Sequence, residues 1–376
     1  MSRRPVSRRH MSRRRTSRLA RLAGLLALAA LAAAAPARAQ QPGVLPGAAA
    51  KTPVEIDAAN LKWNDAERMA TYEGEVVVTQ GGATLHAARL RVYLDKTAKS
   101  AEAAPAVAAP LGAAGSADIR RIEADGPVTV VQKDQIGAGD RGEYDKGKGQ
   151  IVLDGHVVLT QGKNVTAGRR LVYRVATRDV VVDGGRERVR SQFEQEAPQG
   201  GTQPPAAPEP AAFPGAGSSR EPIRIEANRL QWFDATQRAV YSGAVTAVQG
   251  EAAMRATRLT IFVRRDKGAG VSSGGGDRIR RIEAQGPVTI TQKDQVATGA
   301  RAVYDKGAGK VELIGNVTLT QGENVTTGSR MIYDLATKQA TMIGGGSGPR
   351  AQAVFTPSKG GADPLAAPGR GQGRRR

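Results

Sequence analysis

Apolar and polar residues alternate along much of this chain within a seven-residue motif that occurs six times: Gly, any residue, Val, three residues, then Gln. The motif stands at residues 74–80, 126–132, 155–161, 243–249, 286–292 and 315–321. The second residue after the Val is apolar in every copy, so the motif predicts a strand with one buried face. These second apolar residues are Val78, Val130, Leu159, Ala247, Ile290 and Leu319.

The intervening positions are β-branched, which suits a pleated strand: Val77, Thr129, Val158, Thr246, Thr289 and Thr318. The leading Gly fits a turn in which φ is positive, and a Gln-Gly pair closes four of the strands into the next turn. Apolar residues alternate throughout, and helical periodicity is nearly absent. The pattern therefore predicts an all-β chain of short strands.

The six motifs belong to two copies of a longer unit. Residues 120–124 match 280–284 at an offset of 160, whereas Trp63 pairs with Trp232 at an offset of 169. The difference of nine residues lies in an Ala/Pro-rich loop at 97–118 of the first copy, which we expect to be disordered. Internal repetition of strand pairs favours a stacked, solenoid-like or opened jelly-roll form over a closed sandwich or barrel.

The chain begins with an Arg-rich segment, followed by an apolar run at residues 22–35 and the small-x-small pattern Ala37-Arg38-Ala39. This pattern predicts a cleaved signal peptide at residues 1–39, and hence export to the periplasm. The apolar run is shorter than the roughly 20 residues that span a bilayer, although an uncleaved anchor remains the alternative. Met11 opens an equally good signal, and the sequence leaves the export route open.

Composition shifts divide the remainder of the chain. We expect an N-terminal lead at 40–52, a first β domain at 53–190, a Pro/Gly-rich linker at 191–221, a second β domain at 222–344 and a disordered basic tail at 345–376.

Charge and cysteine content exclude several functions. Residues 1–39 contain ten arginines and no acidic residue, so their removal lowers the formal net charge from +20 to +10. Aromatic residues make up 4% of the chain, which disfavours stacking on nucleic acid. The chain has no Cys, so it has neither disulfides nor thiolate metal sites. We expect no cofactor, no metal and no catalytic residue.

The order of these motifs resembles that of the lipopolysaccharide-transport protein A (LptA, or OstA-like) family. The resemblance rests on Tyr-x-Gly-x-Val at 72–76, on Gly-Pro-Val-Thr at 126–129, and on Gly-Asn-Val-Thr-Leu-Thr-Gln-Gly-x-Asn at 315–324. It covers both copies almost end to end. The best-known members of the family carry one such unit, whereas this chain carries two in tandem.

The resemblance implies two open, V-shaped β-jelly-roll domains that hold the acyl chains of lipid A in a groove, within a bridge that carries lipopolysaccharide from the inner to the outer membrane. It also implies LptC-like inner-membrane and LptD-like outer-membrane partners that stack on edge strands, and end-to-end self-association. Arg121 and Arg281 are candidates for phosphate contacts. The predicted groove residues are Val54, Ile56, Val78, Val130, Tyr144, Leu159, Ile223, Ile225, Ile290, Tyr304 and Leu319.

Two other functions are also compatible with the sequence. The chain could be a periplasmic β-solenoid adaptor that joins envelope proteins by strand addition and binds no lipid. A carbohydrate-active β-helix enzyme is the weaker alternative, because alternation points Glu123 and Glu283 outward. Alternation also predicts that the neighbours Arg120 and Arg121 lie on opposite faces. For Trp63 and Trp232, we expect core packing rather than lipid contact.

Overall fold

The computed structural model describes residues 54–95, 119–194, 221–264, 279–345 and 350–355, all within one compact unit, Pro42–Arg376. The expected signal peptide, lead, insertion and most of the linker and tail lie outside these residues. The described residues form twenty strands and no helix, so the all-β prediction is confirmed. No helix in this part of the chain is long and apolar enough to cross a membrane.

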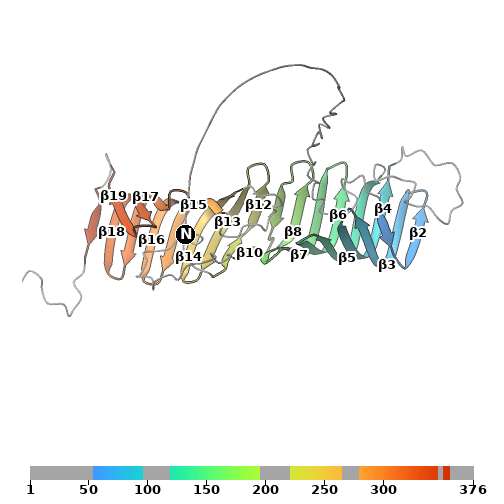
Figure 1. The fold of residues 1–376 in the computed structure, drawn as a ribbon, viewed down its shortest axis with the longest axis horizontal. Coiled ribbons are helices and arrows are strands. Elements are labelled where there is room, and N and C mark those ends of the chain that lie inside the picture. The colour runs from blue at the N-terminus through green and yellow to red at the C-terminus, as the bar shows by residue number, and fades with distance from the viewer. Residues whose placement is uncertain (1–53, 96–118, 195–220, 265–278, 346–349, 356–376) are drawn as a thin grey trace, which may run out of the picture. The chain divides into compact units, whose positions relative to one another are not determined.

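The strands follow one another in antiparallel pairs along the chain (Figure 1). They are β1 (Glu55–Asp57), β2 (Asn60–Asn64), β3 (Met69–Gln80), β4 (Ala83–Leu94), β5 (Ile119–Gln132), β6 (Gln135–Asp145), β7 (Gln150–Gln161), β8 (Asn164–Arg174), β9 (Val180–Asp183), β10 (Val189–Phe193), β11 (Ile223–Ala227), β12 (Arg229–Phe233), β13 (Arg238–Gln249), β14 (Ala252–Val263), β15 (Ile279–Gln292), β16 (Gln295–Asp305), β17 (Lys310–Gln321), β18 (Asn324–Asp334), β19 (Gln339–Ile343) and β20 (Gln352–Val354).

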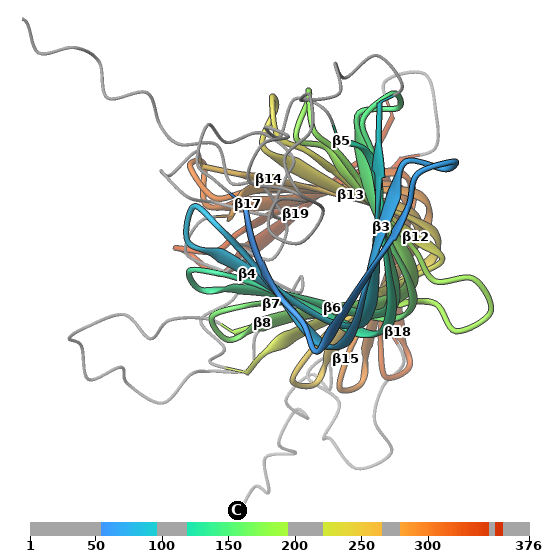
Figure 2. The ribbon, with the colours of Figure 1, turned by 90° about the vertical axis from the view of Figure 1, so that its right-hand side faces the viewer.

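Each long strand belongs to two layers, because its pairing register shifts near its middle. In β3, residues 76–80 pair with 83–87 of β4, residues 69–73 pair with 89–93, and the shift lies between Glu73 and Val76. We call the layer that contains β1, β10, β11 and β20 the first layer, and the layer that contains β2, β9, β12 and β19 the second layer. Figure 2 shows the strands of both layers surrounding one interior, as the predicted jelly-roll class requires.

The motif glycines form the bends between the layers. Their φ angles are positive, as predicted, at +85° for Gly74 and +89° for Gly126. They lie within strands at register shifts, however, and not in turns between strands. Buried and exposed residues alternate on both sides of the bend. The sequence pattern therefore looks like two short strands joined by a turn, although it is one bent strand. A Cβ atom at Gly126 would lie 2.6 Å from the Cβ of Ala88, so the bend also requires the absence of a side chain.

Replacing Gly126 by alanine should lower the free energy of unfolding by about 2 kcal/mol, because the alanine would combine a left-handed backbone with this steric clash. Gly137 provides the control. A Cβ there would meet only Leu153 Cδ1 within 4 Å, at 3.4 Å. Urea denaturation followed by circular dichroism should separate the two variants, and equal losses would contradict the proposed role of the bend.

The two copies join through strand pairs in both layers. In the first layer β10 pairs with β11, and in the second layer β9 pairs with β12. β10 runs past residue 190, and β20 lies inside the segment 345–376 that composition assigned to a tail. Both strands complete the first layer by pairing with β8 and β18, a long-range contact that local composition does not reveal.

The described residues share one apolar core, to which both copies contribute. In this region the buried polar side chains are all uncharged: Gln80, Gln161, Thr166, Ser191, Gln237, Gln249, Thr260 and Gln295. Charged side chains lie on the outside, chiefly on the second layer. One example is the ion pair in which Arg330 Nη2 lies 2.7 Å from Glu312 Oε2.

Candidate functional site

The candidate site is the apolar interior between the two layers. All eleven predicted groove residues face it. Seven of them are buried members of the core cluster: Val78, Val130, Tyr144, Ile223, Ile225, Ile290 and Tyr304. The other four, Val54, Ile56, Leu159 and Leu319, are partly buried and pack against the cluster. The structure thus places these residues together, and their contact with lipid stays a prediction.

Alternation on each strand explains this placement. On β15, Val288 and Ile290 are buried, whereas the alternating residues Thr289 and Thr291 are half-buried on the outer side. Ile290 lies opposite Met254 and Ala297 on the neighbouring strands, and both of these residues are also buried. The inward side chains of successive strands therefore form a continuous apolar wall.

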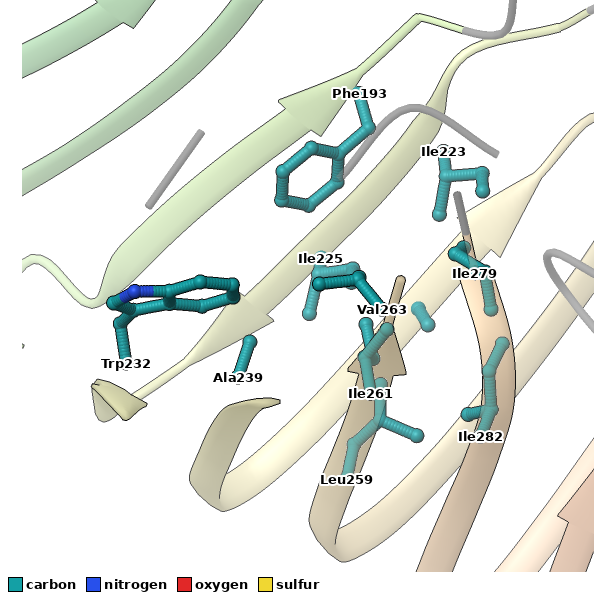
Figure 3. A pocket seen from close by; sticks show the side chains of 11 residues that line it. Phe193, Ile223, Ile225, Trp232, Ala239, Leu259, Ile261, Val263, Ile279 and Ile282 are labelled. Carbon is teal, nitrogen blue, oxygen red and sulfur yellow. The ribbon is translucent and has the colours of Figure 1, made fainter. Parts of the chain in front are cut away.

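A small space in the interior lies beside the junction between the copies (Figure 3). Its volume is about 20 Å³, and it is bounded by Phe193 of the first copy and by residues of the second copy such as Ile225, Trp232 and Ile261. A second space of about 10 Å³ lies among Val54, Val78, Leu90 and neighbouring residues. A single water needs roughly 10–15 Å³, so neither space holds an acyl chain unless the layers move apart.

On the side opposite the bends, no described backbone hydrogen bond joins the two layers. The bends at the motif glycines join them on one side only, and hairpin turns end each layer on the other side. The described backbone hydrogen bonds near these turns stay within a layer, for example from Gly162 N to Asp134 O and from Lys146 N to Arg120 O. Separation of the layers therefore breaks no strand pairing, and its main cost is the exposure of apolar side chains.

Burial in the interior changes the ionisation of its tyrosines. Burial raises the pKa of Tyr72 to about 12 and also raises the pKa values of Tyr144, Tyr173, Tyr241 and Tyr304. These phenols are therefore neutral at physiological pH, and the lining carries no charge. The described residues contain no group of acidic or His side chains that would hold a metal ion.

Arg121 and Arg281 do not face this interior. Arg121 Nη2 lies 2.7 Å from Glu123 Oε1, and Arg281 Nε donates a hydrogen bond to Glu283 Oε1 at 2.7 Å, both on the outer face of the second layer. The suggested phosphate contacts therefore have no support from this placement. The guanidinium of Arg120 lies 5.9 Å from the ring centre of Tyr93, on the same outer face as Arg121.

The alternation expected for Arg120 and Arg121 is therefore wrong. Ile119 pairs with Leu94 while Arg121 pairs with Tyr93, so Arg120 is the extra residue of a β-bulge. The bulge lets Ile119 and Ile122 both point inward. Sequence analysis missed the inward partners that follow such bulges and bends, including Ile119, Leu259, Ile261, Val263 and Ile279.

Comparison with known proteins agrees with this architecture. Residues 55–179 and 224–339 match the family described as "LptA/(LptD N-terminal domain) LPS transport protein", one match for each copy. An uncharacterized protein of Rhizobium meliloti (strain 1021) is 35% identical over 86 residues, which are 23% of this chain and 45% of that protein. This chain thus matches less than half the length of that relative.

A solved structure also shows likeness, that of LptH, the LptA homologous periplasmic component of the lipopolysaccharide transport device of Pseudomonas aeruginosa. It is 23% identical, with a TM-score of 0.31, and the alignment covers 36% of this chain and 96% of that chain. The family match, by contrast, extends over more than half of this chain and includes both copies. The chain therefore belongs to the LptA/(LptD N-terminal domain) family of non-enzymatic lipopolysaccharide-transport proteins.

Proposed function

We propose that this chain is a periplasmic carrier that holds the acyl chains of lipopolysaccharide between its two layers, as part of a bridge from the inner to the outer membrane. One observation carries the proposal: a single uncharged apolar interior continues through both copies. Transfer of a dozen methylenes from water into such an interior is worth on the order of 10 kcal/mol, at about 0.8 kcal/mol each. This is enough to offset exposure of part of the core when the layers separate.

The continuous pairing at the junction supports transfer from one copy to the next. Val182 of β9 lies opposite Leu230 of β12, and Ser191 of β10 lies opposite Ile225 of β11. All four side chains are buried. An acyl chain that moves along the interior therefore meets no charged group among the described residues between the first copy and the second.

The junction also supplies a template for docking at the two ends. β19 and β20 pair with β18 as β9 and β10 pair with β8, and β1 and β2 pair with β3 as β11 and β12 pair with β13. We propose that LptC-like and LptD-like partners, or a second copy of this chain, pair with these terminal strands in the register of the junction.

Exposed apolar side chains at both ends support this docking. At one end they are Leu61 and Trp63, and at the other end it is Phe355. Charge is complementary in the same register. Arg188 Nη1 lies 3.7 Å from Glu226 Oε2 at the junction, and the equivalent residues at the free ends are Arg350 and Asp57.

The exposed ends are equally consistent with the second candidate function, that of an adaptor. An adaptor that joins envelope proteins by strand addition needs the edges and does not need the interior. The two functions therefore differ in a single respect, which is whether lipid enters between the layers.

Photo-crosslinking in living Gram-negative cells tests this point. A photoreactive residue at Ile290 should form adducts with lipopolysaccharide, whereas the same residue at Thr289 should not, because the two side chains lie on opposite sides of one strand. If a folded, exported protein forms adducts at neither position, the carrier function is wrong and the adaptor replaces it.

A further inference from the structure

The Gln that ends each motif occupies a position that strand formation alone does not reserve for a carboxamide. It is the last inward position of the first layer before a hairpin turn. The strand that follows the turn begins with another inward carboxamide in four cases: Gln135, Asn164, Gln295 and Asn324. Only Ala83 and Ala252, at equivalent places in the two copies, depart from this pattern on the long strands.

Strand pairing places these carboxamides side by side. Gln135 lies opposite both Gln132 and Gln161, and Gln161 lies opposite Asn164. The second copy repeats the arrangement with Gln295 opposite Gln292 and Gln321, and with Gln321 opposite Asn324. Neighbouring strands are about 4.8 Å apart, so each copy carries a ladder of amide groups along the edge of its first layer. We call this edge the carboxamide rim.

The opposite edge of the interior has a different composition. The last inward residue before each short turn of the second layer is aromatic with a polar atom: Trp63, Tyr144, Tyr173, Trp232, Tyr304 and Tyr333. Tyr and Trp suit a boundary that is apolar on one side and wet on the other. The two edges thus lie along the side of the interior that is opposite the bends at the motif glycines.

We infer that the carboxamide rim selects the ligand by hydrogen bonding to amide, ester and hydroxyl groups at the boundary between its acyl chains and its polar head. This inference rests on the proposed carrier function and adds to it the part of the ligand that is recognised. A carboxamide both donates and accepts hydrogen bonds and carries no charge, so it complements neutral polar groups better than it complements ions. A site built on hydrogen-bonding groups discriminates against ligands that cannot bond to them.

The alternative is that the amides only bond to one another and to backbone, as Gln249 Nε2 does in donating to Glu221 O at 3.1 Å. In that case the amides stabilise the ends of the strands, and substituting them would change the Kd of every ligand alike. Ligand selectivity therefore separates the two roles.

The experiment measures binding of lipid A and of palmitate to the exported protein by fluorescence displacement. Palmitate supplies an acyl chain without an amide or hydroxyl group. The double variant Gln135→Met and Gln295→Met keeps side-chain length and removes both donor and acceptor. We expect the Kd for lipid A to rise about tenfold, which corresponds to the loss of one or two neutral hydrogen bonds, and the Kd for palmitate to change less than about twofold.

Two further variants control for a general effect of replacing Gln by Met and for disturbed packing. Gln192→Met lies on the outer side of β10 and should leave both Kd values unchanged. Gln321 is exposed at the rim, so Gln321→Met should not disturb packing and should still raise the Kd for lipid A about threefold.

An unchanged Kd for lipid A in the double variant, or an equal loss for both probes, would overturn the inference and leave the carrier function standing. Failure of the unmodified protein to bind either probe would overturn both, before any variant is compared.

Discussion

Replacing Trp232 by alanine should lower the free energy of unfolding by about 3–5 kcal/mol, whereas replacing Trp63 by alanine should lower it by less than about 1 kcal/mol. The two tryptophans occupy the same place in the two copies. Trp232 is 4% exposed because β9 of the first copy pairs with its strand, and Trp63 is 45% exposed because no described strand covers β2 on that side.

The difference follows from the cavity that each substitution creates. Trp232 packs among Phe193, Ala239 and the isoleucines beside the junction, so its removal enlarges a space that already exists there. Removal of the Trp63 ring loses contacts on one side only. The pair therefore measures what the junction contributes, with residue type and repeat position held constant.

Urea denaturation is the appropriate measurement, followed by the fluorescence of the remaining tryptophan. The chain has two tryptophans, so each variant retains one reporter in a known place. If Trp63→Ala destabilises the protein as much as Trp232→Ala does, then β2 is covered in solution and the junction is not the cause of the difference.

The same two tryptophans show how much of side-chain burial the sequence could predict. Core packing was predicted for both tryptophans, and it is correct for Trp232 but wrong for Trp63. Alternation along a strand determines which side chains point inward, and for that reason all eleven predicted groove residues face the interior. Whether an inward side chain is also buried depends on the neighbouring strand, which periodicity does not identify.

The bends and bulges limited the prediction in a second way. A motif that reads Gly-x-Val looks like a turn followed by a strand, yet Gly74 and Gly126 lie inside strands that continue into the other layer. The bulge at Arg120 inverted the face expected for one of two adjacent arginines. The carboxamide rim was likewise hidden, because Gln135 and Gln161 become neighbours only when the register of β6 and β7 is known.

A second variant with a large expected effect lies at the other end of the described chain. Replacing Phe355 by aspartate should weaken end-to-end association by about a hundredfold or more. At the junction, the equivalent residue Phe193 lies opposite Ile223 and is 4% exposed, whereas Phe355 is 74% exposed. Docking in the same register would bury Phe355 against Val54 of the next molecule or against an equivalent residue of a partner.

The expected magnitude combines two losses. The substitution removes a large apolar contact, and it places an unpaired carboxylate where the interface excludes water. Together they exceed the roughly 2.7 kcal/mol that corresponds to a hundredfold change in Kd. Val354→Asp is the matched control, because the equivalent residue at the junction is the outward-facing Gln192, and this change should alter Kd less than about threefold.

Analytical ultracentrifugation over a range of concentrations measures this association, and equal weakening by the two variants would contradict the junction as its template. Such contacts use different surfaces at the two ends, so they extend an open filament and do not close a dimer. The Phe355→Asp protein should also still form lipopolysaccharide adducts at Ile290, because that side chain lies in the interior and three strands, β16, β17 and β18, separate its strand from β20. Loss of association with capture retained would show that lipid binding between the layers and docking at the ends are separate properties of this chain.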